Sequence, residues 1–171
     1  VLPESLRSIE NMAFFECQKL ASFNLPDSLE NVGNLAFGEY AMFSFGDEET
    51  PLIESVHIGP NLKHIGTDAF IMMNIAAFDV DENNPGYASS GGFITSKAKD
   101  MILEVPGGLG KIVTIPDGIT TLQDNLLFNC EDGADFIIPD SVFRFGTSVF
   151  PYTLGDKDES GAWGVKLPEI T

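Results

Sequence analysis

Apolar residues recur along the chain at fixed offsets. When the first apolar residue of each unit is taken as position zero, apolar side chains return at positions plus four, plus seven, plus eleven and plus twelve. Five units follow this rule, with position zero at Leu2, Leu25, Ile58, Ile115 and Ile138. The shortest spacing is about 23 residues. Repetition at such a period predicts a solenoid, in which each unit buries its apolar side against its neighbours.

The residues before position zero predict short parallel strands. Apolar side chains alternate into this position, as in Ile53-x-x-Val56-x-Ile58, and alternation is typical of a half-buried strand. Position plus one is Pro in four of the five units, and Pro ends a strand because it lacks an amide donor. The spacing from plus four to plus twelve predicts irregular or short helical turns on the opposite side. The expected strand ends lie near residues 2, 25, 58, 80, 115, 138 and 167.

Longer spacings between units indicate insertions in a single repeat domain spanning residues 1–171. The three insertions are residues 39–51, 81–114 and 155–161. Within the second, two apolar runs at 93–95 and 101–105 flank polar residues 97–100, a pattern that predicts a β-hairpin. Because Val1 begins in the middle of the pattern, we expect the domain to be part of a longer chain.

The repeat resembles that of a known family. The run from Leu25 to Phe37 reads L-P-D-S-L-E-N-V-G-N-L-A-F and is similar to the BspA-like leucine-rich repeat, I-P-x-S-V-x-x-I-G-x-x-A-F-x-x-C. The run from Ala13 to Cys17 resembles its A-F-x-x-C element, and the insertion after Asp81 resembles one that recurs in the family. This resemblance implies a right-handed β/α superhelix with its strands on the concave face. It also implies a secreted or surface-anchored bacterial protein that acts in adhesion and host contact.

Charge narrows the range of partners. The chain has 9 Lys and Arg against 26 Asp and Glu, for a net charge of −17. Nucleic-acid binding needs a basic surface, and an anionic membrane repels an acidic chain, so we expect neither partner. No apolar run is long enough to span a bilayer, so this fragment is not expected to insert directly into a membrane. A hydrophobic content of 43% with 14 Phe indicates a folded core.

The residues that most often carry chemistry do not form a catalytic pattern. Cys17 and Cys130 share offset plus fifteen in units four strand ends apart, roughly 19 Å at about 4.8 Å per strand, so we expect buried free thiols. His57 and His64 are the only histidines and belong to no nucleophile or zinc motif. Residues 107–111 lack the spacing of a phosphate-binding loop. We therefore expect no enzyme activity, no cofactor and no structural metal.

Two features of the sequence each allow two interpretations. The acidic loops at 79–83 and 156–161 resemble the start of a calcium loop, and are either solvated loops or weak calcium sites. Trp163 is either a ligand platform or packs against an end cap.

The plus-twelve residues are expected to form one continuous buried column through the stack. Its members are Phe14, Phe37, Phe70, Leu127 and Phe150.

The strands also define a candidate binding surface. Residues one and three positions before position zero point away from the core, because side chains alternate along a strand. They form a concave stripe of small polar and occasional apolar groups. The candidate binding residues are Ser22, Asn24, Ser55, His57, Asp79, Ile112, Thr114, Asp135 and Ile137.

Together with the family resemblance, which implies a bacterial surface or secreted protein, this stripe favours a non-enzymatic recognition or adhesion module. Its expected ligand is a host protein or a glycan. An accessory repeat region of a larger secreted enzyme and a structural spacer are the alternatives.

Overall fold

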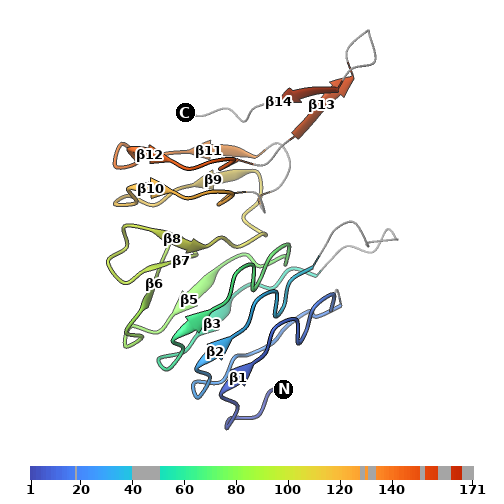
Figure 1. Cartoon of the computed structure of the whole chain (residues 1–171), viewed down its shortest axis with the longest axis vertical. Coiled ribbons are helices and arrows are strands. Elements are labelled where there is room, and N and C mark those ends of the chain that lie inside the picture. The colour runs from blue at the N-terminus through green and yellow to red at the C-terminus, as the bar shows by residue number, and fades with distance from the viewer. Residues whose placement is uncertain are drawn as a thin grey trace.

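The chain forms a stack of coils, a β-solenoid that runs from the N-terminus at one end of Figure 1 to the later strands at the other. The computed structural model describes residues 1–17, 19–39, 51–127, 130 and 134–150, and the backbone of residues 153–157 and 163–166. We call residues 1–80 the N-terminal coils and residues 112–150 the C-terminal coils. The insertion at 81–111 lies between them (Figure 1).

Strands form on two sides of the solenoid, but the strands expected to end near residues 2 and 25 do not form. The side before position zero carries the expected strands, in two parallel pairs: β3 (Val56–Ile58) with β5 (Phe78–Val80), and β9 (Ile112–Thr114) with β11 (Asp135–Ile137). The other side, at plus six and plus seven, carries strands that the apolar spacing did not predict. These are β1 (Ser8–Ile9), β2 (Asn31–Val32) and β4 (His64–Ile65), then β10 (Thr121–Leu122) and β12 (Arg144–Phe145).

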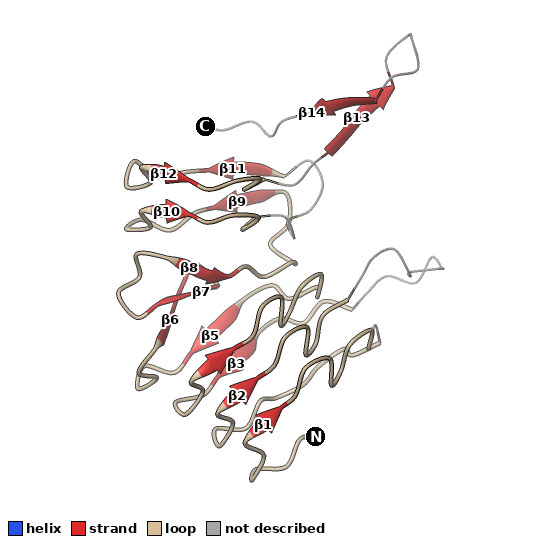
Figure 2. Cartoon of the chain, in the orientation of Figure 1, coloured by secondary structure: helices blue, strands red, loops and turns tan. Residues whose placement is uncertain are grey.

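Of the irregular or short helical turns that were expected, the helical form does not occur in the described coils. Figure 2 shows strands and loops, and the described part of the chain contains no helix. The reason is a residue in the left-handed region at position plus ten of every coil, because a right-handed helix cannot continue through it. These residues, with φ between 51° and 57°, are Met12, Leu35, Asp68, Asn125 and Ser148.

Side-chain oxygens at position plus nine connect successive coils. The Asn34 backbone N–H donates to Oδ1 of Asn11 at 2.8 Å, and the Thr67 N–H donates to Oδ1 of Asn34 at 2.9 Å. The C-terminal coils repeat this bond between the Thr147 N–H and Oδ1 of Asp124, at 2.7 Å. Each bond satisfies a backbone donor that a turn without this side chain would leave open.

The core consists of two separate clusters, one in the N-terminal coils and one centred on the C-terminal coils. In the first, the Phe37 ring stacks between Phe14 and Phe70, with centroid distances of 5.0 and 5.5 Å. Leu127 and Phe150 belong to the second cluster. The expectation of one continuous plus-twelve column was therefore wrong, because the insertion separates Phe70 from Leu127.

The insertion is a small antiparallel sheet. The predicted hairpin is confirmed as β7 (Phe93–Ser96) and β8 (Ile102–Glu104), and β6 (Tyr87–Ser90) adds a third strand. The Phe78 N–H donates to the Gly92 carbonyl oxygen at 2.7 Å, and Met101 forms a parallel bridge with Thr121. The insertion thus contacts the coils on both of its sides.

Both cysteines are free. Cys130 is buried as expected, and burial raises the pKa of its thiol to about 12. Cys17 is exposed, contrary to expectation, because the described chain covers the first coil on one side only.

Some expectations fall at the edges of the described residues. β13 (Thr153–Lys157) and β14 (Trp163–Lys166) pair antiparallel, so β14 does not join the stack as the parallel strand expected to end near Leu167. Residues 40–50 of the first insertion, most of the 156–161 loop and the Trp163 side chain lie outside the described residues.

Candidate functional site

His57 and Asp79 form an exposed polar pair on neighbouring strands. The two residues are register partners on β3 and β5, and Nδ1 of His57 lies 2.9 Å from Oδ2 of Asp79. Their side chains are 44% and 67% exposed. Val56 and Ile58, on either side of His57, are buried, so packing against the core fixes the strand that presents the pair. We call the pair and the exposed Ser55 beside it the His57 patch.

A second exposed group lies on β9 and β11. Ile112 and Ile137 are 65% and 43% exposed, although both are large and apolar. In the register of the two strands, Ile112 faces Asp135 and Thr114 faces Ile137, and all four side chains are exposed. We call these four residues the Ile112 patch. Its chemistry is more apolar than that of the His57 patch.

The structure does not unite the candidate residues in one strand stripe. Ser22 and Asn24 are exposed but lie outside any strand. Strand β7 of the insertion lies beside β5, and β9 pairs only with β11 among the described strands. The candidate residues therefore form two patches on separate strand pairs.

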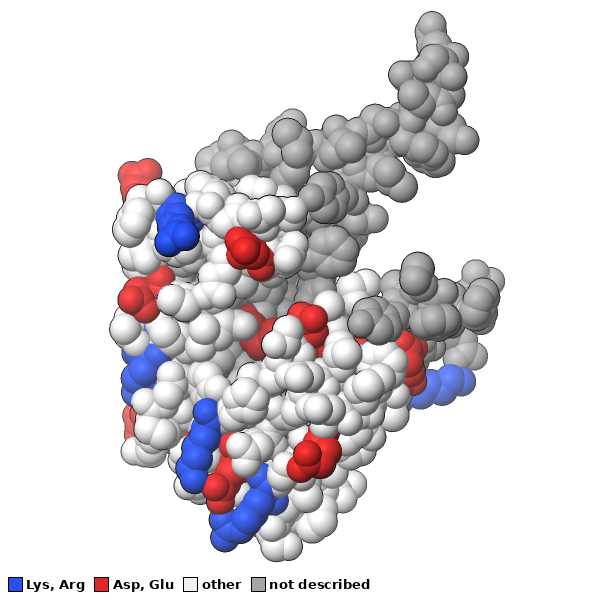
Figure 3. All heavy atoms as spheres, viewed as in Figure 1, with Lys and Arg blue, Asp and Glu red and all other residues white. Residues whose placement is uncertain are grey.

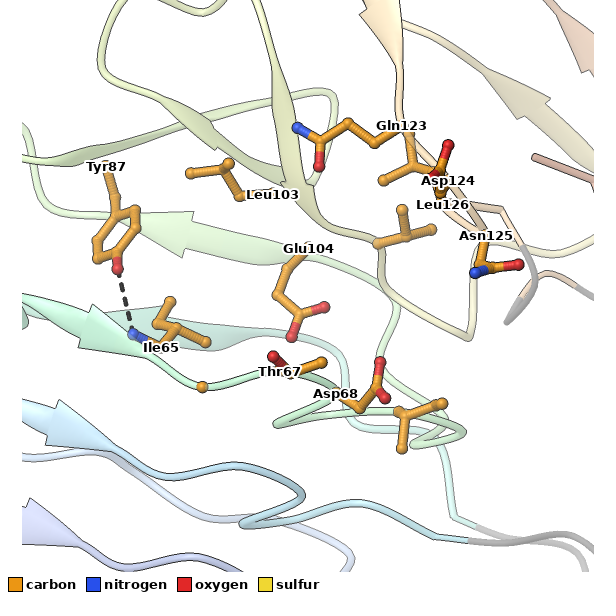
Figure 4. A pocket seen from close by; sticks show the side chains of 13 residues that line it. Ile65, Thr67, Asp68, Tyr87, Leu103, Glu104, Gln123, Asp124, Asn125 and Leu126 are labelled. Carbon is orange, nitrogen blue, oxygen red and sulfur yellow. Dashed lines mark hydrogen bonds between the residues drawn. The ribbon is translucent and has the colours of Figure 1, made fainter. Parts of the chain in front are cut away.

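The structure also contains a cleft that sequence reasoning missed. It has a volume of about 670 Å³ and lies between the turn at 65–71 of the N-terminal coils and the turn at 123–126 of the C-terminal coils. Tyr87 of β6 and Leu103 and Glu104 of β8 form its remaining wall. Figure 4 shows Glu104 reaching toward Thr67 and Asp68, with Gln123 to Leu126 on the far side.

The cleft occupies the place of a missing turn. The unit that ends its strand at Val80 has Tyr87 at plus seven but Gly91 and Gly92 at plus eleven and plus twelve, because the insertion replaces its turn. This gap in the aligned units is the signal from which the cleft could have been found, since a solenoid without one turn has a gap there.

Glu104 has the most altered ionisation in the cleft. The pKa of its carboxyl is raised to about 8, first by burial and then by the negative charge of Asp68, while hydrogen bonds from the backbone of Val105 and Phe70 oppose the rise. At neutral pH the carboxyl therefore carries a proton for most of the time.

The cleft is acidic in composition. Asp68, Glu104 and Asp124 line it, and Figure 3 shows acidic side chains in the recess between the lower and upper coils. Within the described ranges, no three His, Cys, Asp or Glu side chains are arranged to hold a metal ion. The surface chemistry of the cleft is that of hydrogen-bonding oxygens beside apolar side chains.

Tyr87 closes one open strand edge beside the cleft. The Lys63 carbonyl corresponds to that of Glu30, which accepts a hydrogen bond from Lys63 N–H of the next coil. No coil follows Lys63 directly, and the Tyr87 hydroxyl donates to its carbonyl oxygen at 3.3 Å. The same hydroxyl accepts the Ile65 N–H at 3.1 Å. Burial raises the pKa of this phenol, so the hydroxyl stays protonated and able to donate.

Asn84, near the start of the insertion, forms hydrogen bonds both to the last N-terminal coil and to the insertion itself. It is fully buried, and its amide group donates to the carbonyl oxygens of Gly59 and Leu62 at 2.8 and 3.0 Å. Its Oδ1 accepts the N–H groups of Gly86 and Tyr87. Asn84 thereby ends the last N-terminal coil and positions Tyr87 at the edge.

Known structures share this fold. A leucine-rich cell surface protein from Faecalibacterium prausnitzii is 22% identical, with a TM-score of 0.63 over 87% of this chain. The pneumococcal vaccine antigen PcpA is 20% identical, with a TM-score of 0.52 over 83% of this chain. A leucine-rich repeat protein from Eubacterium ventriosum is 17% identical, with a TM-score of 0.52 over 84%. The chain spans only 37–42% of these three proteins.

Sequence comparison identifies the repeat itself. No curated protein matches the chain. Across the described residues, no helix has the length and apolar character to cross a membrane. The model of the BspA-type leucine-rich repeat region matches six copies within residues 1–46 and 109–155, more than half of the chain. The chain belongs to the BspA-type leucine-rich repeat family.

Proposed function

We propose that the chain is a non-enzymatic recognition module of a bacterial surface or secreted protein, and that it binds a host protein or a glycan through the His57 patch. The observation that carries this proposal is the exposed His57–Asp79 pair, held at 2.9 Å on two strands whose other faces are buried. A rigid backing lowers the entropic cost of binding, because the polar groups are already in place.

The chemistry of the pair suits a polar ligand. An imidazole beside a carboxylate offers a donor and an acceptor side by side, which matches a hydroxyl or an amide group. The Ile112 patch adds apolar contact area, and aliphatic anchors beside polar groups are common in protein interfaces. A surface location is supported by the family and by the similar structure from Faecalibacterium prausnitzii, which is described as a cell surface protein.

Binding to cultured epithelial cells and to an array of mammalian glycans tests the proposal. We expect fluorescently labelled chain to bind one of the two, and the double variant His57→Ala, Asp79→Ala to lose at least about tenfold in affinity. Its melting temperature is expected to stay within about 2 °C of the wild type, because both side chains are exposed.

A matched control is available in another exposed ion pair. The variant Arg7→Ala, Glu30→Ala removes a pair between β1 and β2 on the other strand side, and it should bind like the wild type. Equal binding by the His57 patch variant would contradict the assignment of the site. Absence of binding to both cells and glycans would favour a structural spacer.

A further inference from the structure

A backbone ladder joins each coil to the next on the turn side. The N–H groups at plus ten and plus twelve of one coil donate to the carbonyl oxygens at plus nine and plus eleven of the next. In the N-terminal coils, Leu35 donates to Thr67 at 3.1 Å and Phe37 donates to Ala69 at 2.8 Å. In the C-terminal coils, Asn125 donates to Thr147 at 3.0 Å and Leu127 to Val149 at 2.8 Å.

This ladder is broken at the cleft. Asp68 on one wall and Phe70, two residues further along the same turn, hold the donor positions. Asp124 and Leu126 hold the acceptor positions on the other wall. The Asp68 N–H and the carbonyl oxygens of Asp124 and Leu126 have no hydrogen-bond partner among the described residues. One wall of the cleft therefore presents a backbone donor and the other wall presents backbone acceptors.

The second donor of the ladder, at Phe70, shows what kind of group these backbone positions bind. The Phe70 backbone makes a hydrogen bond with the Glu104 carboxyl, where a carbonyl of the next coil would lie in an uninterrupted stack. A side chain of the insertion thus supplies one acceptor of the missing turn. The other ladder positions have no hydrogen-bond partner within the described ranges.

We propose that the cleft binds an extended peptide segment of another protein, which carries a basic side chain and completes the ladder as the missing turn. A peptide presents carbonyl oxygens and N–H groups in alternation, so the same segment can accept from Asp68 and donate to Asp124 and Leu126. Main-chain pairing of this kind supplies affinity when a peptide is added to an open edge. The peptide carbonyl replaces Glu104 at Phe70.

Charge selects the side chains of this peptide. The cleft carries the carboxyl groups of Asp68, Glu104 and Asp124, and the chain as a whole has a net charge of −17. Once displaced from Phe70, the Glu104 carboxyl is free to pair with a lysine or arginine of the peptide. Apolar contacts come from Leu103 and Leu126, which line the same cleft.

The turn geometry adds a sequence preference. Position plus ten adopts a left-handed conformation in every described coil, including Leu35 with φ 54° and Asp68 with φ 56°. Gly or Asn is favoured there in a peptide that replaces a turn, because other residues are strained in this region and a free peptide has no coil around it to offset the strain. The proposed partner is therefore a basic segment with a glycine at its centre.

A fluorescein-labelled probe peptide with the sequence Lys-Asn-Gly-Ala-Leu-Gly-Lys tests the proposal by fluorescence anisotropy with the full chain. We expect saturable binding. N-methylation of the third residue, Gly, and of the fifth residue, Leu, should weaken this binding at least about tenfold, because methylation removes the two amide donors. Replacing both lysines of the probe by glutamine should weaken binding by a smaller factor. Added salt should weaken only the lysine probe.

Variants of the chain locate the binding. Leu103→Trp fills the cleft and should weaken the probe at least about tenfold, whereas Met101→Trp, at an exposed residue just before β8 and outside the cleft, should not. Gln123→Arg adds a cation to the opposite wall and should also weaken binding of the lysine probe. This variant replaces Leu103→Trp as the test if Leu103→Trp does not fold. Thermal melting checks the fold of each variant.

Several results would overturn the proposal. They are no binding to the wild type at millimolar probe, equal binding of the N-methylated probe, or equal effects of the two tryptophan variants. Binding of cellohexaose in place of the probe would assign the cleft to a glycan. The variant His57→Ala, Asp79→Ala is expected to bind the probe normally, so failure of the His57 patch proposal leaves this result unchanged.

Discussion

The N-terminal and C-terminal coils build the same turn around different cores. In the N-terminal coils, the Phe37 ring is stacked between Phe14 and Phe70 and also lies 4.5 Å from the Phe23 centroid. In the C-terminal coils, the equivalent plus-twelve position holds the aliphatic Leu127, also fully buried. The turn thus requires a buried apolar side chain at this position but not an aromatic one.

The backbone of the turn does not differ between the two regions. Both have a left-handed residue at plus ten, a side-chain oxygen at plus nine that accepts an N–H from the next coil, and the same ladder bonds. Hydrogen bonding therefore defines the shape of the coil, and the core residues determine how strongly neighbouring coils adhere. The following changes separate these two contributions.

Truncation of the stacked ring should have the largest effect. Phe37→Ala removes a ring that is 2% exposed and contacts three others, and we expect a loss of about 3–5 kcal/mol in the free energy of unfolding. Phe143→Ala, at a ring that is 79% exposed, should change stability by less than about 0.5 kcal/mol. Urea unfolding measures both. Equal losses would mean that aromatic stacking does not hold the N-terminal coils together.

The ionisation of Glu104 tests the region between the two sets of coils. Its folded pKa of about 8 lies above the ordinary value of 4.5, so protonation favours the folded state. The stabilisation is complete below about pH 4.5 and is lost as the pH rises to about 8, by up to about 2–4 kcal/mol. Glu104→Gln should remove this slope from the pH dependence of chemical unfolding.

The exposed Glu54→Gln provides the control, because it removes a carboxylate outside the cleft. Its stability should follow that of the wild type from pH 4 to pH 9. If Glu104→Gln does the same, Glu104 ionises freely and the cleft does not bury it.

Adding a Cβ where neighbouring coils approach closely should reduce stability equally in both regions. A Cβ on Gly66 would lie 2.4 Å from the Asn34 backbone nitrogen, and one on Gly146 would lie 2.4 Å from Oδ1 of Asp124. We expect Gly66→Ala and Gly146→Ala to cost about 1–3 kcal/mol each in thermal unfolding. Gly86→Ala, where the nearest atom is at 4.0 Å, should cost less. Unequal losses at Gly66 and Gly146 would show that the two backbones are not equivalent.

Removal of single plus-nine oxygens should have the smallest effect. Asn34→Ala and Asp124→Ala each leave a backbone N–H of the next coil without its acceptor, at a cost of about 1 kcal/mol. Asp124→Asn keeps an acceptor oxygen and should be nearly neutral. Hydrogen exchange of the Thr67 and Thr147 amides reports each bond directly, and unchanged protection would contradict its role.

Much of this architecture was accessible from the sequence, because apolar side chains must alternate where a strand lies on a core. That pattern located β3 and β5 and the hairpin of β7 and β8. The strands at plus six and plus seven were missed since two residues, such as Ser8 and Ile9, are too short to show a period. The left-handed residues were missed because Leu35 and Asp68 are not glycine.

The candidate site was harder to predict than the fold. Exposure of His57 and Asp79 followed from strand alternation, and the structure places them in contact. The cleft depends on which turn is absent. The pKa of Glu104 is raised by burial in that cleft and by the charge of Asp68, which lies 36 residues earlier in the chain. Periodicity reports what each unit contains but not how an insertion fits between two units.

The closure made by Tyr87 and Asn84 has a consequence for how genes of this kind change in length. Since these two residues complete the last N-terminal coil, the coils before them do not need a partner of defined sequence after them. An in-frame duplication or deletion of one repeat, 23 residues in the shortest units, alters the length of one stack and leaves the other stack and the insertion in register. The length of the N-terminal stack can therefore evolve separately from whatever the second stack presents.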